Sequence, residues 1–286
     1  MRILVTGAGG QLGTDLVRLA GAGGRHEIVA PSSADLDVGD RDLVMAAVTG
    51  SQPDLVVHAA AWTAVDACES DRSRAFRVNA FGCRNIAEAA RSVGAHVVAV
   101  STDYVFDGAS TLPYTEWDRP NPLSVYGQSK LAGELEILTL VPTAAVVRTS
   151  WVGGPHGSNM IKTILRLAAG DGPLRFVDDQ RGCPTFTDDL AGMLWRLALS
   201  RRPGVFHVTN QGATTWYGFA RDVLAAAGHD PARVEPISTA QLDPPRPAPR
   251  PANSVLDNAA LRSSGIPLLP DFHDPLERTV KALTNC

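Results

Sequence analysis

Short apolar runs alternate with longer amphipathic segments along the first half of the chain. The apolar runs cover residues 2–6, 27–30, 54–58, 96–100 and 144–148 and are typical of strands buried on both faces of a parallel sheet. The segments between them, at residues 11–20, 40–48, 71–93 and 126–140, show helical spacing of apolar residues. This alternation predicts an α/β fold with a doubly wound parallel sheet and right-handed crossovers.

The second half of the chain is less regular. Its apolar spacing predicts helices near residues 160–169, 188–198 and 217–227 and a strand at residues 205–208. Prolines crowd residues 244–251, which is typical of a stiff, extended linker. We expect residues of about 185–210 to return to the sheet. The rest of residues 149–286 should form mainly a smaller C-terminal α/β lobe that binds a substrate.

Three glycines follow the first predicted strand and open the first predicted helix. Gly7 permits a tight turn, Gly10 lets a pyrophosphate approach the backbone, and Gly13 lets the helix pack closely. The free N–H groups at the start of that helix favour an anion. The spacing therefore predicts a Rossmann-type dinucleotide-binding domain over residues 1–148.

The end of the second predicted strand bears on the choice of cofactor. NAD-binding proteins usually place a carboxylate there to hold the ribose diol. This chain has Ala30, Pro31, Ser32 and Ser33, so no acid would repel a 2′-phosphate and two hydroxyls could bind one. The sequence favours NADPH and leaves NADH possible.

Tyr126 and Lys130 lie four positions apart on a predicted helix and therefore share a face. We expect the Lys130 ammonium to lower the pKa of the Tyr126 phenol and to hold the hydroxyls of the nicotinamide ribose. Thr102, at the carboxyl end of the strand over residues 96–100, is the candidate for gripping a substrate carbonyl. The pattern predicts hydride transfer with Tyr126 as the proton donor.

Composition narrows the function classes. The chain has 286 residues, of which 44% are hydrophobic and 20% charged, with a net charge of −4. These values predict one large domain or two intertwined lobes, and they offer no basic excess for nucleic acid. No apolar stretch of about eighteen residues is present and the N-terminal run is too short for a signal peptide, so we expect a cytoplasmic protein without a membrane partner. The four cysteines and seven histidines show no metal-ligand spacing, so no metal site is predicted.

Taken together, the chain resembles the extended short-chain dehydrogenase/reductase superfamily and, within it, the dTDP-4-dehydrorhamnose reductases. The resemblance spans nearly the whole chain and is specific in combination. The motifs that carry it are Thr6-Gly7, Gln11-Leu12-Gly13 and residues 59–66, 101–108, 126–134, 148–152, 179–185, 214–216 and 250–254.

The resemblance implies reduction of the C4 ketone of dTDP-4-dehydro-β-L-rhamnose to dTDP-L-rhamnose, the last step of dTDP-rhamnose biosynthesis, with NADPH or NADH. It implies a catalytic triad of Thr102, Tyr126 and Lys130. The cofactor-binding residues it implies are Gly7, Gly10, Gln11, Leu12, Gly13, Asp37, Val38, Ala61, Trp62, Thr63, Tyr126 and Lys130. The substrate-binding residues it implies are Thr102, Asp103, Trp151 and Trp216.

Several of these residues have structural alternatives. Trp151 and Trp216 could be core aromatics, Asp103 could orient a loop, and Asp37 could cap a turn. Two further residues are open in the same way. Asn79 could brace the site or lie on a helix surface, and Arg250 could pair with the diphosphate or face solvent.

The resemblance also leaves Mg²⁺ and the oligomeric state open. Mg²⁺ is possible because the family often requires it, and the chain could be a monomer or a homodimer. The last nine residues, 278–286, carry no acid, which does not favour a metal-bridged dimer.

Two other kinds of function compete with the reductase. One is another nucleotide-sugar reductase, epimerase or dehydratase of the same superfamily. Dehydratases typically place Asp-Glu after the active-site threonine, whereas Asp103 is followed here by Tyr104, which favours plain reduction. The other is a non-catalytic regulatory subunit with the same fold, against which the intact Thr102, Tyr126 and Lys130 argue.

Overall fold

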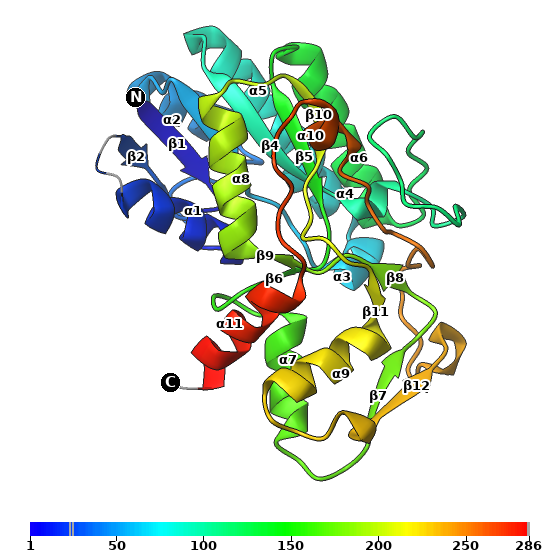
Figure 1. Cartoon of the computed structure of the whole chain (residues 1–286). Helices are drawn as coiled ribbons and strands as arrows, with labels where there is room; N and C mark the ends of the chain where they lie inside the picture. Colours follow the sequence, from blue (N-terminus) through cyan, green and yellow to red (C-terminus); the bar gives the residue numbers. More distant parts are fainter. Residues whose placement is uncertain (23, 25, 285–286) are drawn as a thin grey trace.

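The central sheet of the molecule has six parallel strands in the order β10-β5-β4-β3-β1-β2 (Figure 1). The computed structural model describes residues 1–22, 24 and 26–284. The strands are β1 (Arg2–Thr6), β2 (Glu27–Val29), β3 (Leu55–His58), β4 (His96–Thr102), β5 (Ala145–Thr149) and β10 (Gly204–His207). The predicted doubly wound parallel sheet is confirmed, because each apolar run identified in the sequence forms one of these strands.

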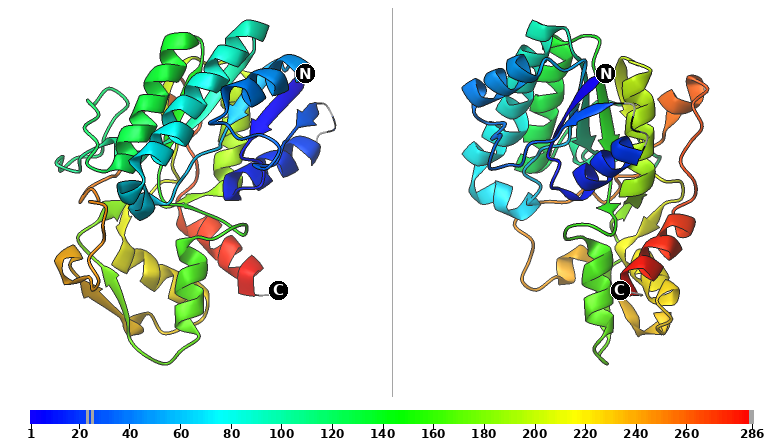
Figure 2. Two further views of the ribbon diagram at one scale, coloured as in Figure 1. Left: turned by 180° about the vertical axis from the view of Figure 1, so that it is seen from behind. Right: turned by 90° about the vertical axis from the view of Figure 1, so that its left-hand side faces the viewer.

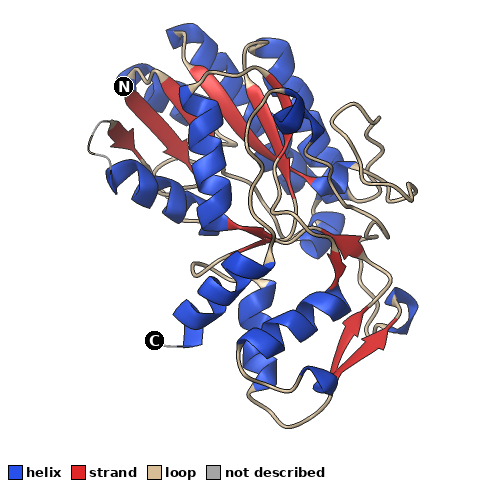
Figure 3. Cartoon of the chain, viewed as in Figure 1, coloured by secondary structure: helices blue, strands red, loops and turns tan. Residues whose placement is uncertain are grey.

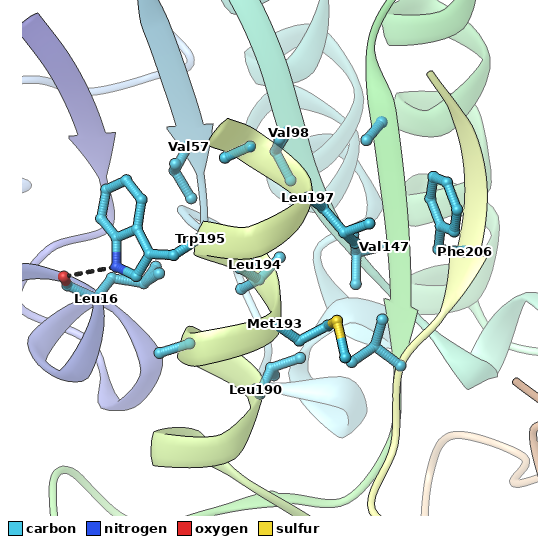
Figure 4. Close-up of a cluster of buried hydrophobic side chains, with 14 of the residues drawn as sticks. Leu16, Val57, Val98, Val147, Leu190, Met193, Leu194, Trp195, Leu197 and Phe206 are labelled. Carbon is cyan, nitrogen blue, oxygen red and sulfur yellow. Dashed lines mark hydrogen bonds between the residues drawn. The ribbon is translucent and has the colours of Figure 1, made fainter. Parts of the chain in front are cut away.

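Helices cover both faces of the sheet, giving three layers (Figure 2). One face carries α1 (Gln11–Ala22) and α8 (Thr187–Leu199), and the other carries α2 (Arg41–Ser51), α5 (Gly82–Val93) and α6 (Val125–Leu140). Leu190, Leu194 and Leu197 of α8 are fully buried against the sheet (Figure 4). The Trp195 indole reaches across to α1, where its Nε1 donates to the carbonyl of Leu16 at 3.1 Å.

A smaller lobe lies beside the carboxyl ends of the sheet strands (Figure 3). It contains α7 (Met160–Ala168), α9 (Trp216–Ala226) and α11 (His273–Thr284), which share one apolar core. Its strands form three two-stranded pairs: β7 (Leu174–Val177) with β12 (Val234–Ile237), β8 (Arg181–Gly182) with β11 (Thr214–Thr215), and β6 (Val152–Gly153) with β9 (Thr185–Phe186). The predicted C-terminal α/β lobe is therefore present.

The segment predicted as one helix over residues 71–93 is broken into several pieces. It comprises α4 (Arg72–Phe76), the π-helical turn η1 (Arg77–Phe81) and α5, and the unpredicted α3 (Val65–Ser70) precedes it. Asp71 separates α3 from α4, because its side chain accepts the N–H of Arg74 and starts a new helix. The π-turn is noteworthy because such insertions often occur at functional sites.

The later chain returns to the sheet twice. The first return supplies α8 and β10 and falls within the predicted residues 185–210. The second was not predicted: α10 (Ala259–Ser263) and the residues after it add Leu261, Ile266 and Leu269 to the apolar core that α8 also enters. The boundary at residue 148 between a dinucleotide domain and a substrate lobe stays a prediction. The remaining short elements are the 3-10 turns η2 (Asp103–Val105), η3 (Pro231–Arg233) and η4 (Thr239–Gln241).

Candidate active site

The loop after β1 and the first turn of α1 contain two glycines, Gly7 and Gly13, that no other residue could replace without strain. Gly7 has a φ of +72°, and a Cβ there would lie 2.7 Å from the backbone nitrogen of Ala60. A Cβ on Gly13 would lie 2.0 Å from the Gly7 carbonyl oxygen. Gly10 closes the turn by donating its N–H to that same carbonyl at 3.0 Å. The first turn of α1 follows the loop directly. It lies beside β1, between β3 and β2, where the strand order of the sheet reverses.

A cavity of about 530 Å³ lies against this loop and takes walls from both lobes. Most of the site residues predicted from the sequence line it: Gly7, Gly10, Gln11, Leu12, Gly13, Ala61, Thr63, Thr102, Asp103, Tyr126, Lys130, Trp151 and Trp216. The glycine loop, the Tyr126–Lys130 helix and the predicted substrate side are thus brought together in one place. Because Gly7, Gly10 and Gly13 line the cavity at the N-terminus of α1 and carry no side chain into it, the loop fits a dinucleotide pyrophosphate.

Three predicted cofactor residues do not line the cavity. The Asp37 carboxylate pairs with Arg77 at 2.7 Å, and Val38 is buried in the core beneath α2 and α5. The Trp62 indole lies under the Arg74 guanidinium, whose Cζ is 4.6 Å from the ring centroid. Their roles toward a cofactor stay predictions.

Tyr126, Lys130 and Thr102 meet where α6 approaches the carboxyl end of β4. Ser124 caps the helix by accepting the N–H of Gly127 at 3.1 Å. Lys130 is buried and its Nζ donates to the carbonyl of Val100 at 2.7 Å. Tyr126 is buried as well, and all three predicted triad residues reach the same cavity.

The expectation that the pKa of the Tyr126 phenol is lowered is wrong. Burial raises the pKa of the Tyr126 phenol above its ordinary value, and a hydrogen bond with Thr102 opposes this only in part. Burial also lowers the pKa of Lys130, and Cys83 and Glu134 act in the opposite direction. Helical spacing correctly predicted that the two side chains reach the same cavity, but it could not reveal that both are shielded from water.

Of the two alternatives for Asn79, the structure favours bracing of the site over a position on a helix surface. It lies in the π-turn η1, is buried, and its Nδ2 donates to the Trp62 carbonyl at 3.1 Å and to the Ser129 hydroxyl at 3.0 Å. Its Oδ1 accepts the N–H of Trp62 at 2.8 Å. Ser129 in turn donates to the carbonyl of Tyr126 at 2.8 Å. One amide thus joins the loop after β3 to the helix that carries the tyrosine.

Two stacked indoles form the wall opposite the glycine loop. The Trp151 and Trp216 rings are 3.6 Å apart at the centroids and inclined by 7°. Trp151 has an unusual φ of +45°, and a Cβ on Gly182 would lie 2.5 Å from its ring, so a glycine is needed beside it. Both indoles line the cavity and also pack against the lobe core through Phe219. Both are therefore core aromatics that also reach the cavity, and their contact with a substrate stays a prediction.

Some lining residues were not singled out from the sequence. They lie in or near the ends of β3, β4 and β5, in α3, or between β5 and α7: Ala59, Val65, Val100, Ser101, Tyr104, Thr149, Ser150, Val152, Gly157 and Ser158. The position of Thr149 and Ser150 at the end of a predicted strand was the signal available for them, because carboxyl ends of parallel strands share one edge. Asn159 Nδ2 donates to the Gln11 side chain at 2.9 Å and so holds the loop before α7 near the glycine cradle.

Arg250 does not face solvent, whereas its pairing with a diphosphate stays a prediction. Its guanidinium makes a two-pronged ion pair with Asp66, at 2.7 and 2.8 Å, and its side chain is 13% exposed. Asp66 also accepts the N–H of Ala248 at 3.2 Å. The proline-rich segment over residues 244–251 is therefore tied to α3, beside the cavity residue Val65.

Neither a metal cluster nor a membrane span is found in the described part of the chain. Within residues 1–22, 24 and 26–284, no three His, Cys, Asp or Glu side chains converge to hold a metal ion. Over the same residues, no helix is both long and apolar enough to cross a bilayer. Cys68, Cys83 and Cys183 are buried free thiols. The Mg²⁺ that the resemblance left possible is therefore not supported by the described residues.

Asp103 should destabilise the folded protein at neutral pH. Burial raises its pKa to about 6, and its Oδ2 has no hydrogen-bond partner. The folded state therefore keeps a proton that the unfolded chain loses above about pH 4, and stability falls as the pH rises through about 6. We expect Asp103→Asn to raise the free energy of unfolding by about 3 kcal/mol near pH ~7 and by only about 0.5 kcal/mol near pH ~4.

Urea unfolding of both proteins at the two pH values checks this expectation. A gain of the same size at both would contradict it, because a pH-independent gain cannot come from titration of Asp103.

Comparison with known proteins places the chain in a family. It matches the RmlD substrate binding domain family over residues 1–285. The dTDP-4-dehydrorhamnose reductase of Mycolicibacterium smegmatis is 41% identical over 285 residues, which are 99% of this chain and 86% of that protein. A probable dTDP-4,6-dihydroxy-2-methyloxan-3-one 4-ketoreductase of Streptomyces antibioticus is 42% identical over 280 residues, which are 96% of this chain and 93% of that protein.

A solved structure agrees with these relatives. The crystal structure of Bacillus anthracis dTDP-4-dehydrorhamnose reductase in complex with NADP superposes with a TM-score of 0.93 at 36% identity, covering 97% of this chain and 98% of that one. From its fold, its cavity and these matches, the chain belongs to the RmlD substrate binding domain family, the family of the dTDP-4-dehydrorhamnose reductases.

Proposed function

We propose that this protein reduces the C4 ketone of dTDP-4-dehydro-β-L-rhamnose to dTDP-L-rhamnose with NADPH. The observation that carries the proposal is the meeting of Tyr126, Lys130 and Thr102 with the glycine cradle in one cavity. Membership of the reductase family supports the same reaction. We keep the cytoplasmic location as a prediction.

The cradle of Gly7, Gly10 and Gly13, with the N-terminus of α1, would hold the cofactor diphosphate. When bound, NADPH supplies the hydride that reduces the C4 carbonyl. The absence of an acid among residues 30–33, directly after β2, and the NADP in the Bacillus anthracis neighbour support NADPH over NADH. Of the two hydroxyls predicted to meet a 2′-phosphate, that of Ser32 donates to Asp35 at 2.6 Å.

Tyr126 would give its phenolic proton to the sugar O4. Its raised pKa suits this direction, because a buried phenol stays protonated until a basic alkoxide forms beside it. The Thr102 hydroxyl would stabilise the charge that grows on O4, and Lys130 would hold the nicotinamide ribose. Asp103 and the stacked Trp151 and Trp216 would form the sugar-binding wall.

The Streptomyces antibioticus relative favours a second candidate of the same chemistry. Its name places the reduced ketone at C4 of a different dTDP-linked sugar, and it is as similar to this chain as the rhamnose enzymes are. The choice between the two sugars is therefore a matter for assay.

NADPH oxidation by the purified protein tests the proposal. We expect one NADPH consumed per dTDP-4-dehydrorhamnose reduced, and a kcat/KM at least about tenfold lower with UDP- or GDP-linked keto sugars. NADH in place of NADPH should also lower kcat/KM. Conversion without net NADPH consumption would point to an epimerase or dehydratase. Binding of NADPH with no turnover on any keto sugar would point to a regulatory subunit.

Tyr126→Phe should lower kcat by about 10²–10⁴-fold because the proton donor is lost, while the ring still fills its place. The Kd for NADPH should stay within about threefold. Tyr217→Phe is a matched control, because that phenol lies on α9 outside the cavity. Turnover of the Tyr126 variant equal to that of the control would remove Tyr126 as the proton donor.

A further inference from the structure

The helix that carries Tyr126 and Lys130 has a third buried polar residue one turn further on. Tyr126, Lys130 and Glu134 are spaced four apart and form one buried stripe of α6. The Lys130 ammonium donates a hydrogen bond to the carbonyl of Val100 in β4, and the Glu134 carboxylate accepts one from the next residue of that strand, Ser101. Glu134 Oε1 accepts the Ser101 hydroxyl at 2.5 Å.

The carboxylate is held from a second strand as well. Arg148 of β5 donates from Nε to Glu134 Oε1 at 2.9 Å and from Nη2 to Oε2 at 2.7 Å. The two side chains are 5% and 3% exposed, and the Arg148 Cζ lies 5.3 Å from the centroid of the Phe106 ring. Such two-pronged geometry fixes orientation as well as distance.

Neither member of this ion pair reaches the cavity, but the residues beside both do. Ser101 and Thr102 of β4 line it on one side. Thr149 and Ser150, which follow Arg148 directly, line it on the next strand. The ion pair is thus the point where the catalytic helix and both strand ends are joined.

We propose that Glu134 and Arg148 are positioning residues, whose ion pair sets the placement of Tyr126 and Lys130 against the ends of β4 and β5. Stability alone does not account for such a pair, because apolar residues of similar volume often stabilise a protein as well as a buried ion pair does. If the pair instead fixes geometry, replacing it with apolar residues should leave the fold intact but lower kcat.

The pair also sets the charge around Lys130. The groups that act on this ammonium are Glu134 on its own helix and Cys83 on α5, and the nearby His58 on β3 is neutral because burial lowers its pKa to about 3. Burial lowers the pKa of Lys130, and Glu134 acts in the opposite direction. Removing the Glu134 charge should therefore make Lys130 lose its proton at lower pH.

Three variants test the proposal. Glu134→Gln removes the charge and keeps an acceptor for Ser101. Glu136→Gln is the matched control, because that residue lies two positions away on the same helix with 30% of its side chain exposed, paired only at 3.5 Å with Arg84. The double variant Glu134→Leu/Arg148→Met replaces the pair with apolar groups and leaves no buried charge unpaired.

We expect Glu134→Gln to lower kcat at least tenfold with little change in KM, and to move the alkaline loss of NADPH affinity to lower pH, while Glu136→Gln changes neither. The double variant should unfold at a temperature close to that of the parent protein and still show the tenfold loss of kcat. Full kcat in the folded double variant would overturn the proposal, as would an unmoved alkaline limb in Glu134→Gln.

The kcat readout rests on the proposed function, whereas the pH dependence of NADPH affinity does not need the sugar substrate. A parent protein that binds NADPH but reduces no keto sugar would therefore contradict the proposed function alone. In that case the alkaline limb of NADPH binding still decides whether Glu134 supports Lys130.

Discussion

The close approach of α6 to the end of β4 is the constraint on which the site depends. The approach requires glycine at two positions of α6. A Cβ on Gly127 would lie 2.2 Å from the Tyr104 carbonyl oxygen, and a Cβ on Gly133 would lie 2.3 Å from the Asn79 carbonyl oxygen. With glycine at both positions the helix sinks between β4 and the π-turn. The polar stripe of Tyr126 and Lys130 is thereby buried at the carboxyl edge of the sheet, beside the cavity that the glycine loop also lines.

Burial sets the protonation states of Tyr126 and Lys130, and it also destabilises the fold because both polar groups lose contact with water. A phenol away from water stays neutral, which is the form that can protonate an alkoxide, whereas a buried ammonium must be held by local acceptors. Lys130 finds one in the Val100 carbonyl. Asp103 carries an unpaired carboxylate oxygen in the same wall. Such locally unfavourable groups are tolerated where a site needs them, and the apolar layers on both sheet faces supply the compensating stability.

Local patterns in the sequence predicted what local physics decides. The strands buried in the sheet, the glycine turn and the shared face of Tyr126 and Lys130 all follow from short-range spacing. The two-residue strands of the smaller lobe have no such period, and the π-turn around Asn79 keeps the apolar spacing of an ordinary helix. The ion pair of Arg250 with Asp66 joins residues 184 apart in the chain, and only the folded topology brings them together. The pKa directions of Tyr126 and Lys130 depend on burial in the same way, so they could not be inferred from spacing.

The central claim is that one phenol, one ammonium and the glycine cradle serve a single reacting centre. A crystal structure with NADP⁺ and dTDP-L-rhamnose bound together tests it most directly. The account predicts the sugar O4 within hydrogen-bond distance of the Tyr126 hydroxyl, with the nicotinamide ring over C4 and its ribose on Lys130. A dinucleotide seated in the glycine loop but with its nicotinamide remote from Tyr126, or a sugar whose O4 faces another side chain, would contradict it.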